Sequence, residues 1–185
     1  MKKLLLFAVV GMFFSTLEAQ NIYFTKDAKI NFNSSTPLED IVAETNQGTT
    51  FIDIVKNEVK FSVLTTSFKF RRALMEEHFN ENYMESSKNK EFAKAKFSGT
   101  ITSPIDWKSE KKVTVEVKGD FTMHGVTKPI TLQAQITPGK SGIAATAEFR
   151  IVPQDYNIAI PAAVQDKIAK EVTIKVDANY TLYQH

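Results

Sequence analysis

Residues 112–137, KVTVEVKGDFTMHGVTKPITLQAQIT, decide the fold of this chain. Apolar and polar side chains alternate strictly over residues 113–123, which is the period of a strand with one apolar and one polar face. Gly119 interrupts the apolar series, and a glycine inside a strand often marks a bend or bulge. The alternation returns over residues 130–136 after a glycine-containing turn at residues 124–129. The stretch therefore predicts an antiparallel hairpin.

The same alternation repeats along the chain on both sides of this hairpin. The segment 38–46 also fits one helical turn, and we interpret it as a strand because its neighbours are strands. Turns are predicted at Gln47-Gly48, at Lys56-Asn57 and at residues 138–142, where turn-forming residues separate the alternating runs. The remaining strands are predicted at residues 21–33, 38–46, 51–55, 59–68, 93–101, 145–151 and 172–182.

Two segments depart from the strand period. Residues 71–86 place Leu74, Met75, Phe79 and Tyr83 at helical spacing with acidic residues opposite, which predicts one amphipathic helix. A short helical turn is predicted at about residues 162–169. An extended piece that carries Ile158 and Ile160 precedes this turn.

Eight or nine one-sided strands in about 165 residues predict an all-β fold. A flat sheet of this size would leave its apolar face uncovered, and one helix cannot cover it. Closure of the sheet buries that face and removes the edges. We therefore expect residues 20–185 to form a single antiparallel barrel of the lipocalin type, with eight strands or slightly more. Such a barrel is either filled by side chains or holds one small ligand.

The N-terminal residues are typical of a targeting segment. Met1-Lys2-Lys3 is a basic start, residues 4–14 are apolar, and Ala19 ends a short polar stretch, which together predict a signal peptide cleaved after Ala19. The apolar run is too short to span a membrane as a helix. The expected location is the periplasm. Cysteine is absent, which excludes disulfides, a thiolate metal site and a lipidated cysteine.

Charge and residue pattern argue against two other protein classes. The 23 Lys and Arg nearly balance the 21 Asp and Glu, so the sequence does not predict a nucleic-acid partner. A membrane barrel with its apolar face on lipid is the alternative orientation. It is disfavoured because recurring aromatic girdles are missing and because the polar face carries lysines in mid-strand: Lys60, Lys94, Lys96, Lys118 and Lys175.

Candidate catalytic and metal-binding groups are few. His78 with Glu81 or Asn82 could form a metal pair on the helix, although such groups are usually solvated, and we predict no metal and no cofactor. His124 and Asp120 share one strand face that we expect to face water. No nucleophile motif, phosphate-binding glycine loop or paired-carboxylate motif stands out in the sequence. We therefore do not expect an enzyme.

Six phrases of the sequence resemble the YceI-like family in order and spacing, and the similarity runs from about Tyr23 to the C-terminus. The resemblance implies a lipocalin-like barrel with a helix packed against it, export to the periplasm, and a long isoprenoid or quinone-like amphiphile held inside the barrel. The family supplies no catalytic motif, so its binding residues correspond only to apolar barrel positions. The phrases are SFKF (67–70), LMEEHFNENYMES (74–86), KAKFSG (94–99), GDFTMHGVTK (119–128), DYNIAIP (155–161) and IAKEV (168–172).

The predicted ligand-binding positions are the apolar side chains that alternation places on the inner face, together with two from the helix. The alternative is that these side chains simply fill the core. Alanines beside large residues favour an open channel. The positions are Phe61, Val63, Phe79, Tyr83, Phe97, Ile101, Val115, Val117, Phe121, Met123, Leu132, Ile136, Phe149, Ile151, Ile158, Ile160, Ile174, Val176 and Tyr180.

The helix at 71–86 is predicted to form the gate of this site, because it breaks the series of hairpins where a long chain can enter. The candidates for head-group binding are Arg71, Arg72, His78 and Asn82. The loop at 155–161 is the alternative entrance. Two other functions stay open, an isomerase or cyclase acting on a hydrophobic substrate and a structural or stress protein with a filled core. The oligomeric state, including a dimer, also stays open.

Overall fold

The computed structural model describes residues 21–184 of the chain, so the predicted signal peptide lies outside the described residues. No helix in the described part of the chain is long and apolar enough to cross a membrane. The described residues form nine strands and one short α-helix. These are β1 (Ile22–Ser35), β2 (Asp40–Asp53), β3 (Glu58–Leu64), β4 (Lys69–Phe70), α1 (Ala73–His78), β5 (Lys94–Ile101), β6 (Val113–Met123), β7 (Val126–Gly139), β8 (Gly142–Ile151) and β9 (Val172–Leu182).

Eight long strands close into an antiparallel barrel, as the sequence predicts. Each pairs with its neighbours along the chain, and β1 pairs with both β2 and β9, which closes the ring. The short β4 extends β3 beyond a 3₁₀ turn at Thr65–Ser67 and pairs with Ala43 and Glu44 of β2. Closure leaves no long unpaired edge among the strands of residues 21–184.

The β6–β7 hairpin confirms the expectation from residues 112–137, with a tighter turn than predicted. Met123 pairs directly with Val126, so only His124 and Gly125 form the turn, and both have positive φ (50° and 75°). This is the geometry of a two-residue type I′ hairpin. The ladder runs through Gly119 without a register shift, so the expected bulge is absent there. Instead, a Cβ on Gly119 would lie 2.4 Å from the Cα of Gly99.

The turn predicted at Gln47-Gly48 is wrong. Both residues lie inside β2, which runs unbroken from the predicted strand at 38–46 into the one at 51–55. Gly48 pairs with Ala28 of β1, and the register between β1 and β2 shifts on either side of Ala28. A Cβ on Gly48 would lie 2.6 Å from Cδ1 of Ile30. The glycine therefore permits close approach at a bulge in the partner strand rather than a chain reversal.

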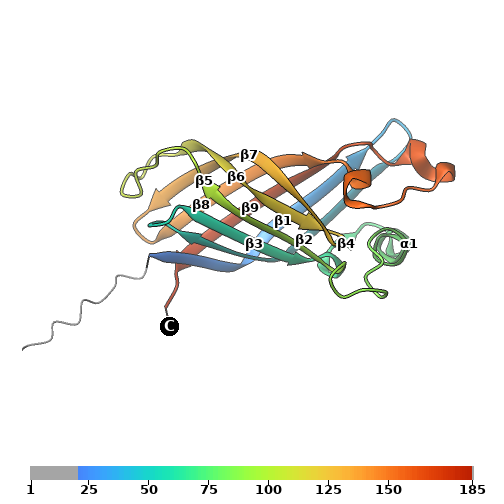
Figure 1. The fold of residues 1–185 in the computed structure, drawn as a ribbon, viewed down its shortest axis with the longest axis horizontal. Coiled ribbons are helices and arrows are strands. Elements are labelled where there is room, and N and C mark those ends of the chain that lie inside the picture. Colours follow the sequence, from blue (N-terminus) through green and yellow to red (C-terminus); the bar gives the residue numbers. More distant parts are fainter. Residues whose placement is uncertain (1–20, 185) are drawn as a thin grey trace, which may run out of the picture.

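The helical turns gather at one end of the barrel, as Figure 1 shows with α1 on the right and the C-terminus on the left. We call the two ends the helical end and the plain end. The predicted helix at 71–86 is present but shorter. The α-helical part, α1, ends at His78, and a π-helical turn follows at Phe79–Tyr83. The helical turn predicted at 162–169 is a 3₁₀ turn, Ala162–Lys167, and a second 3₁₀ turn, Pro153–Tyr156, precedes it.

Apolar side chains point into the barrel and polar side chains point out. At the plain end the interior is solid, because Ala28 and Val115 (both 0 % exposed) pack with the buried Ile101 and Ile143. Trp107, in the loop that joins β5 to β6, packs against this core and donates from Nε1 to Oδ1 of Asn57 at 3.1 Å. The lysines named above are exposed on the outer face, except the half-buried Lys94.

Candidate functional site: an apolar cavity inside the barrel

The barrel encloses a cavity of about 470 Å³. It is lined by alternate residues of the strands, from Thr50 and Tyr180 toward the plain end to Leu74 and Lys167 at the helical end. Its volume lies within the range of about 300 to 1,000 Å³ that small-molecule sites occupy. The structure brings most of the predicted binding positions to its wall, and these are Phe61, Val63, Phe79, Tyr83, Phe97, Val117, Phe121, Met123, Leu132, Ile136, Phe149, Ile151, Ile158, Ile160, Ile174, Val176 and Tyr180.

Two predicted binding positions do not line the cavity. Ile101 and Val115 point inward, but both belong to the solid core of the plain end. Alternation predicts which face of the sheet a side chain occupies, but it does not predict how much of the barrel interior is filled. Facing side chains from other strands decide that.

The helical segment forms part of the cavity wall. Leu74, Met75, Phe79 and Tyr83 all line the cavity, although Leu74 is 60 % exposed and covers the opening only at its edge. The ring of Phe79 lies among three other phenylalanines, with its centroid 5.0 Å from that of Phe70, 5.8 Å from Phe32 and 6.3 Å from Phe68. Sequence reasoning missed these three, although Phe32 and Phe70 continue apolar alternations.

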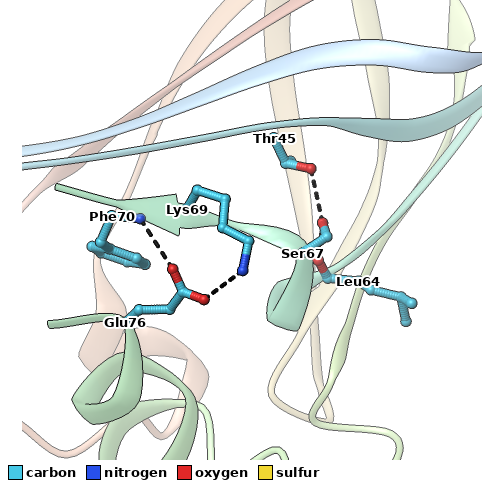
Figure 2. Close-up of polar contacts among 6 residues, drawn as sticks. All are labelled: Thr45, Leu64, Ser67, Lys69, Phe70 and Glu76. Carbon is cyan, nitrogen blue, oxygen red and sulfur yellow. Dashed lines mark hydrogen bonds and ion pairs between the residues drawn. The ribbon is translucent and has the colours of Figure 1, made fainter. Parts of the chain in front are cut away.

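Glu76 fastens α1 to β4, as Figure 2 shows. Its carboxylate accepts from Nζ of Lys69 at 2.6 Å and from the backbone N–H of Phe70 at 3.4 Å. The hydrogen bond from Lys69 holds the pKa of Glu76 below its usual value. Figure 2 also shows Ser67 donating to the carbonyl of Leu64 at 2.7 Å while its oxygen lies 2.9 Å from Oγ1 of Thr45. These bonds fix the break between β3 and β4, from which the helix departs.

Charged side chains surround the mouth of the cavity. Of the four predicted head-group residues, Arg72 and His78 line the cavity, whereas Arg71 and Asn82 do not. Arg72 forms an ion pair with Glu39, which also lines the cavity. Lys167 is a further lining cation that the sequence analysis missed, because nothing in its local pattern indicates that it faces the barrel. Within residues 21–184 it has no ion-pair partner.

The segment at 153–168 forms the opposite side of the mouth. Ile158, Ile160, Val164 and Ile168 line the cavity. The backbone N–H of Ala169 donates to Oγ of the fully buried Ser34 at 2.9 Å, which ties this segment to β1. The mouth therefore lies between the predicted gate and the segment that we named as the alternative entrance.

The expectation that His124 faces water is wrong. The positive φ of the tight turn directs its ring inward, where it is 6 % exposed and lies 4.1 Å from the ring of Phe92. Its Nδ1 donates to the carbonyl of Tyr156 at 3.1 Å, and its Nε2 lies 3.5 Å from Oε2 of Glu85. His124 does not line the cavity. It joins the β6–β7 turn to the end of the helical segment.

The cavity offers few groups for catalysis. Among its described lining residues, the only acid is Glu39, which pairs with Arg72, and the only imidazole is the exposed His78, both at the mouth. Burial raises the pKa of Tyr180 to about 12, so its phenol keeps its proton at neutral pH. No group of three or more His, Cys, Asp or Glu side chains in the described residues is placed to hold a metal ion.

Comparison with known proteins identifies relatives of this chain. A family model described as a YceI-like domain matches residues 14–180. A protein of Pseudomonas fluorescens named UPF0312 protein is 33 % identical over 78 residues, which cover 42 % of this chain and 38 % of that protein. A Pseudomonas putida protein named UPF0312 protein PputGB1_5030 is 32 % identical over 94 residues, which cover 46 % of this chain and 45 % of that protein. The chain thus matches less than half the length of these curated relatives.

Two solved structures have the same fold. One is described as a polyisoprenoid binding domain from Saccharophagus degradans implicated in plant cell wall breakdown; it has a TM-score of 0.72 and 14 % identity, and the match covers 89 % of this chain and 100 % of that one. The other is BcnA of Burkholderia cenocepacia, with a TM-score of 0.68, 14 % identity, and coverage of 83 % and 96 %. At this identity the two structures support the barrel fold and say nothing by themselves about the ligand.

Proposed function

The chain belongs to the YceI-like family, and on that basis we propose that its barrel binds a long-chain isoprenoid or quinone-like amphiphile with the chain in the lumen. The observation that carries this proposal is the apolar cavity of about 470 Å³ with its mouth at the helical end. Each buried CH₂ contributes about 0.8 kcal/mol, so a few isoprene units suffice for binding without a charged contact. A structural protein with a filled core would not have this cavity.

We propose binding rather than catalysis. An isomerase or cyclase needs a titratable group placed against the reacting atoms inside the barrel. The acid and the imidazole of the cavity wall lie at its mouth, and the deeper wall is built from aliphatic, aromatic and hydroxyl side chains. Carrying or sequestering a lipid requires only this apolar surface.

We propose that the protein performs this role in the periplasm after export. The support is the sequence pattern of residues 1–19, with its basic start, apolar run and small residue at Ala19. N-terminal sequencing of protein recovered from a periplasmic fraction should begin near Gln20. Recovery only from the cytoplasm with an intact N-terminus would contradict the proposal.

Mass spectrometry of organic extracts tests the binding function. Protein purified without detergent from its native compartment should release a long-chain lipid in a stoichiometric amount. Two substitutions on the same strand serve as variant and matched control. Ala147 lines the cavity and Ala144 is exposed on the outer face of β8, so Ala147→Phe should exclude the lipid whereas Ala144→Phe should retain it. Reproducibly empty extracts, or the same lipid content in both variants, would overturn the proposal.

A further inference from the structure

A pair of hydroxyl groups lies in the cavity wall far from the mouth. Thr50 (1 % exposed) is close to the end of β2 at Asp53, and Tyr180 (6 % exposed) is close to the end of β9 at Leu182, so both belong to the plain end of the barrel. Both residues line the cavity, and their oxygens are 3.1 Å apart. This pair therefore places a polar spot in the part of the cavity toward the plain end, which we call the floor and where Ile52 and Val59 also line the wall.

The neighbouring backbone decides how the two protons are arranged. Oγ1 of Thr50 also lies 2.9 Å from the carbonyl oxygen of Lys60, and that oxygen can only accept. Thr50 has a single hydroxyl proton, which this bond uses. The bond between the two side chains must then be donated by Tyr180. The phenolic oxygen has no proton left for the cavity, while it keeps lone pairs that can accept.

Burial keeps this floor electrically neutral. The pKa of Tyr180 rises to about 12 because burial disfavours the phenolate, so the group is a neutral phenol at physiological pH. Of the described cavity-lining residues, the basic side chains are those of Arg72, His78 and Lys167, and all three come from the helical end. An anionic group at the floor would have no partner, whereas a small neutral donor would satisfy an unused acceptor.

We propose that Thr50 and Tyr180 form an acceptor site that selects ligands entering with a compact hydrogen-bond donor first, such as the hydroxyl of a long-chain alcohol. This inference rests on the proposed binding function and adds a ligand class and an orientation to it. The chain then extends from the floor to the mouth, where Leu74, Met75 and Phe79 contact its far end. Ligands with an anionic head group instead place that group among the cations of the mouth.

The test compares four ligands that share one C20 isoprenoid chain. The alcohol geranylgeraniol, its methyl ether, the parent hydrocarbon and geranylgeranyl phosphate are titrated against delipidated full-length mature protein, with native mass spectrometry or calorimetry as the readout. One net hydrogen bond corresponds to a preference of about threefold to tenfold. We expect the alcohol to bind more tightly than the ether by that factor, because the ether cannot donate and presents its oxygen to an acceptor.

Substitution of Thr50 should reverse this preference. In Thr50→Val the phenol of Tyr180 loses its acceptor and turns its own proton toward the cavity, so the ether should gain affinity relative to the alcohol. The double variant Thr50→Val with Tyr180→Phe should bind alcohol and ether equally. Thr114→Val, on the exposed face of β6, is the matched control and should keep the wild-type preference. The affinity for the phosphate should not change in Thr50→Val.

The outcomes separate this inference from the proposed function. If the wild-type protein binds alcohol, ether and hydrocarbon equally, the acceptor site is overturned while lipid binding stands. If it binds none of the four ligands, the binding function fails and the inference fails with it. The ligand series on the wild-type protein decides the question even where a variant does not fold.

Discussion

The two ends of the barrel are built from the same alternating strands, but the interior is filled at one end and open at the other. At the plain end the connections are short, apart from the 102–112 loop that Trp107 packs over the core, and side chains such as Val115 and Ile143 fill the lumen. At the helical end the two long connections, 65–93 and 152–171, carry the helical turns and leave a cavity between them. The difference shows that the long connections place the mouth at the helical end, whereas facing side chains of the strands fill the plain end.

The largest expected difference between the ends concerns stability. Ile101→Ala should lower the free energy of unfolding by about 2–5 kcal/mol, because it leaves a void in the solid core of the plain end. Leu74→Ala at the helical end should change it by no more than about 0.5 kcal/mol, since that side chain is mostly exposed. Urea unfolding followed by circular dichroism measures both. Equal losses would show that the plain end is not a separately packed core.

Alkaline unfolding examines the floor between the two regions. The pKa of Tyr180 is raised from 10.0 to about 12 in the folded protein, so the fold binds this proton more tightly than the unfolded chain does. The resulting stability is fully present below pH 10 and is lost as the pH rises through about 12. Its size is on the order of 3 kcal/mol, since each unit of pKa shift corresponds to about 1.4 kcal/mol.

Denaturant titrations at pH 9.5 and 12 should reveal most of this loss in the wild-type protein, and the stability of Tyr180→Phe should fall less over the same interval by a similar amount. The other groups that titrate in this range are common to both proteins and cancel in the difference. Parallel pH profiles of the two proteins would contradict the expected burial of the phenol.

Removing the aromatic contacts of the gate should affect kinetics more than folding. Phe79→Ala with Met75→Ala removes the ring that packs on Phe70 and one neighbouring wall residue, and aromatic pairs contribute about 0.5–1.5 kcal/mol each. We expect ligand release to accelerate about tenfold, as about 1.4 kcal/mol off the barrier implies. The circular dichroism of the barrel should be unchanged.

Stopped-flow transfer of a fluorescent isoprenoid to vesicles measures this release rate. Glu77→Ala, which alters an exposed residue of α1 outside the cavity wall, is the control and should release ligand at the wild-type rate. If the double variant also releases at that rate, the gate must be sought at residues 153–168.

The smallest expected effect separates two adjacent arginines. Arg72 lines the mouth and Arg71 does not. Arg72→Ala should therefore lower the affinity for geranylgeranyl phosphate by up to about fivefold, as expected for an exposed charge pair of about 0–1 kcal/mol. Arg71→Ala should leave the affinity unchanged, and neither variant should alter geranylgeraniol binding. Calorimetry at low and high salt provides the measurement. Equal effects of the two variants would place the head group outside this mouth.

The alternation that begins with residues 112–137 and repeats along the chain was sufficient to predict the barrel and its inner face, because side-chain period is a local property of an extended chain. Together with the helical spacing at 71–86 and the extended piece at 158–160, this alternation predicted 17 positions that line the cavity. Ile101 and Val115 also point inward, but they belong to the filled plain end. Local signals were misleading where a glycine fits either a turn or a closely packed strand. Gly48 resembles a turn residue, yet it permits close packing against Ala28 and Ile30.

Only the tertiary structure decided the features that depend on side chains far apart in the sequence. It placed Lys167 and Arg72 at one mouth, buried His124 beside Glu85, and brought Thr50 within 3.1 Å of Tyr180 across 130 residues. The sequence alone determined the strands, the helical interruption and the apolar lumen. The boundary between plug and cavity, and the polar spot on its floor, depend on which strands face one another once the barrel closes, and that arrangement is a property of the whole ring.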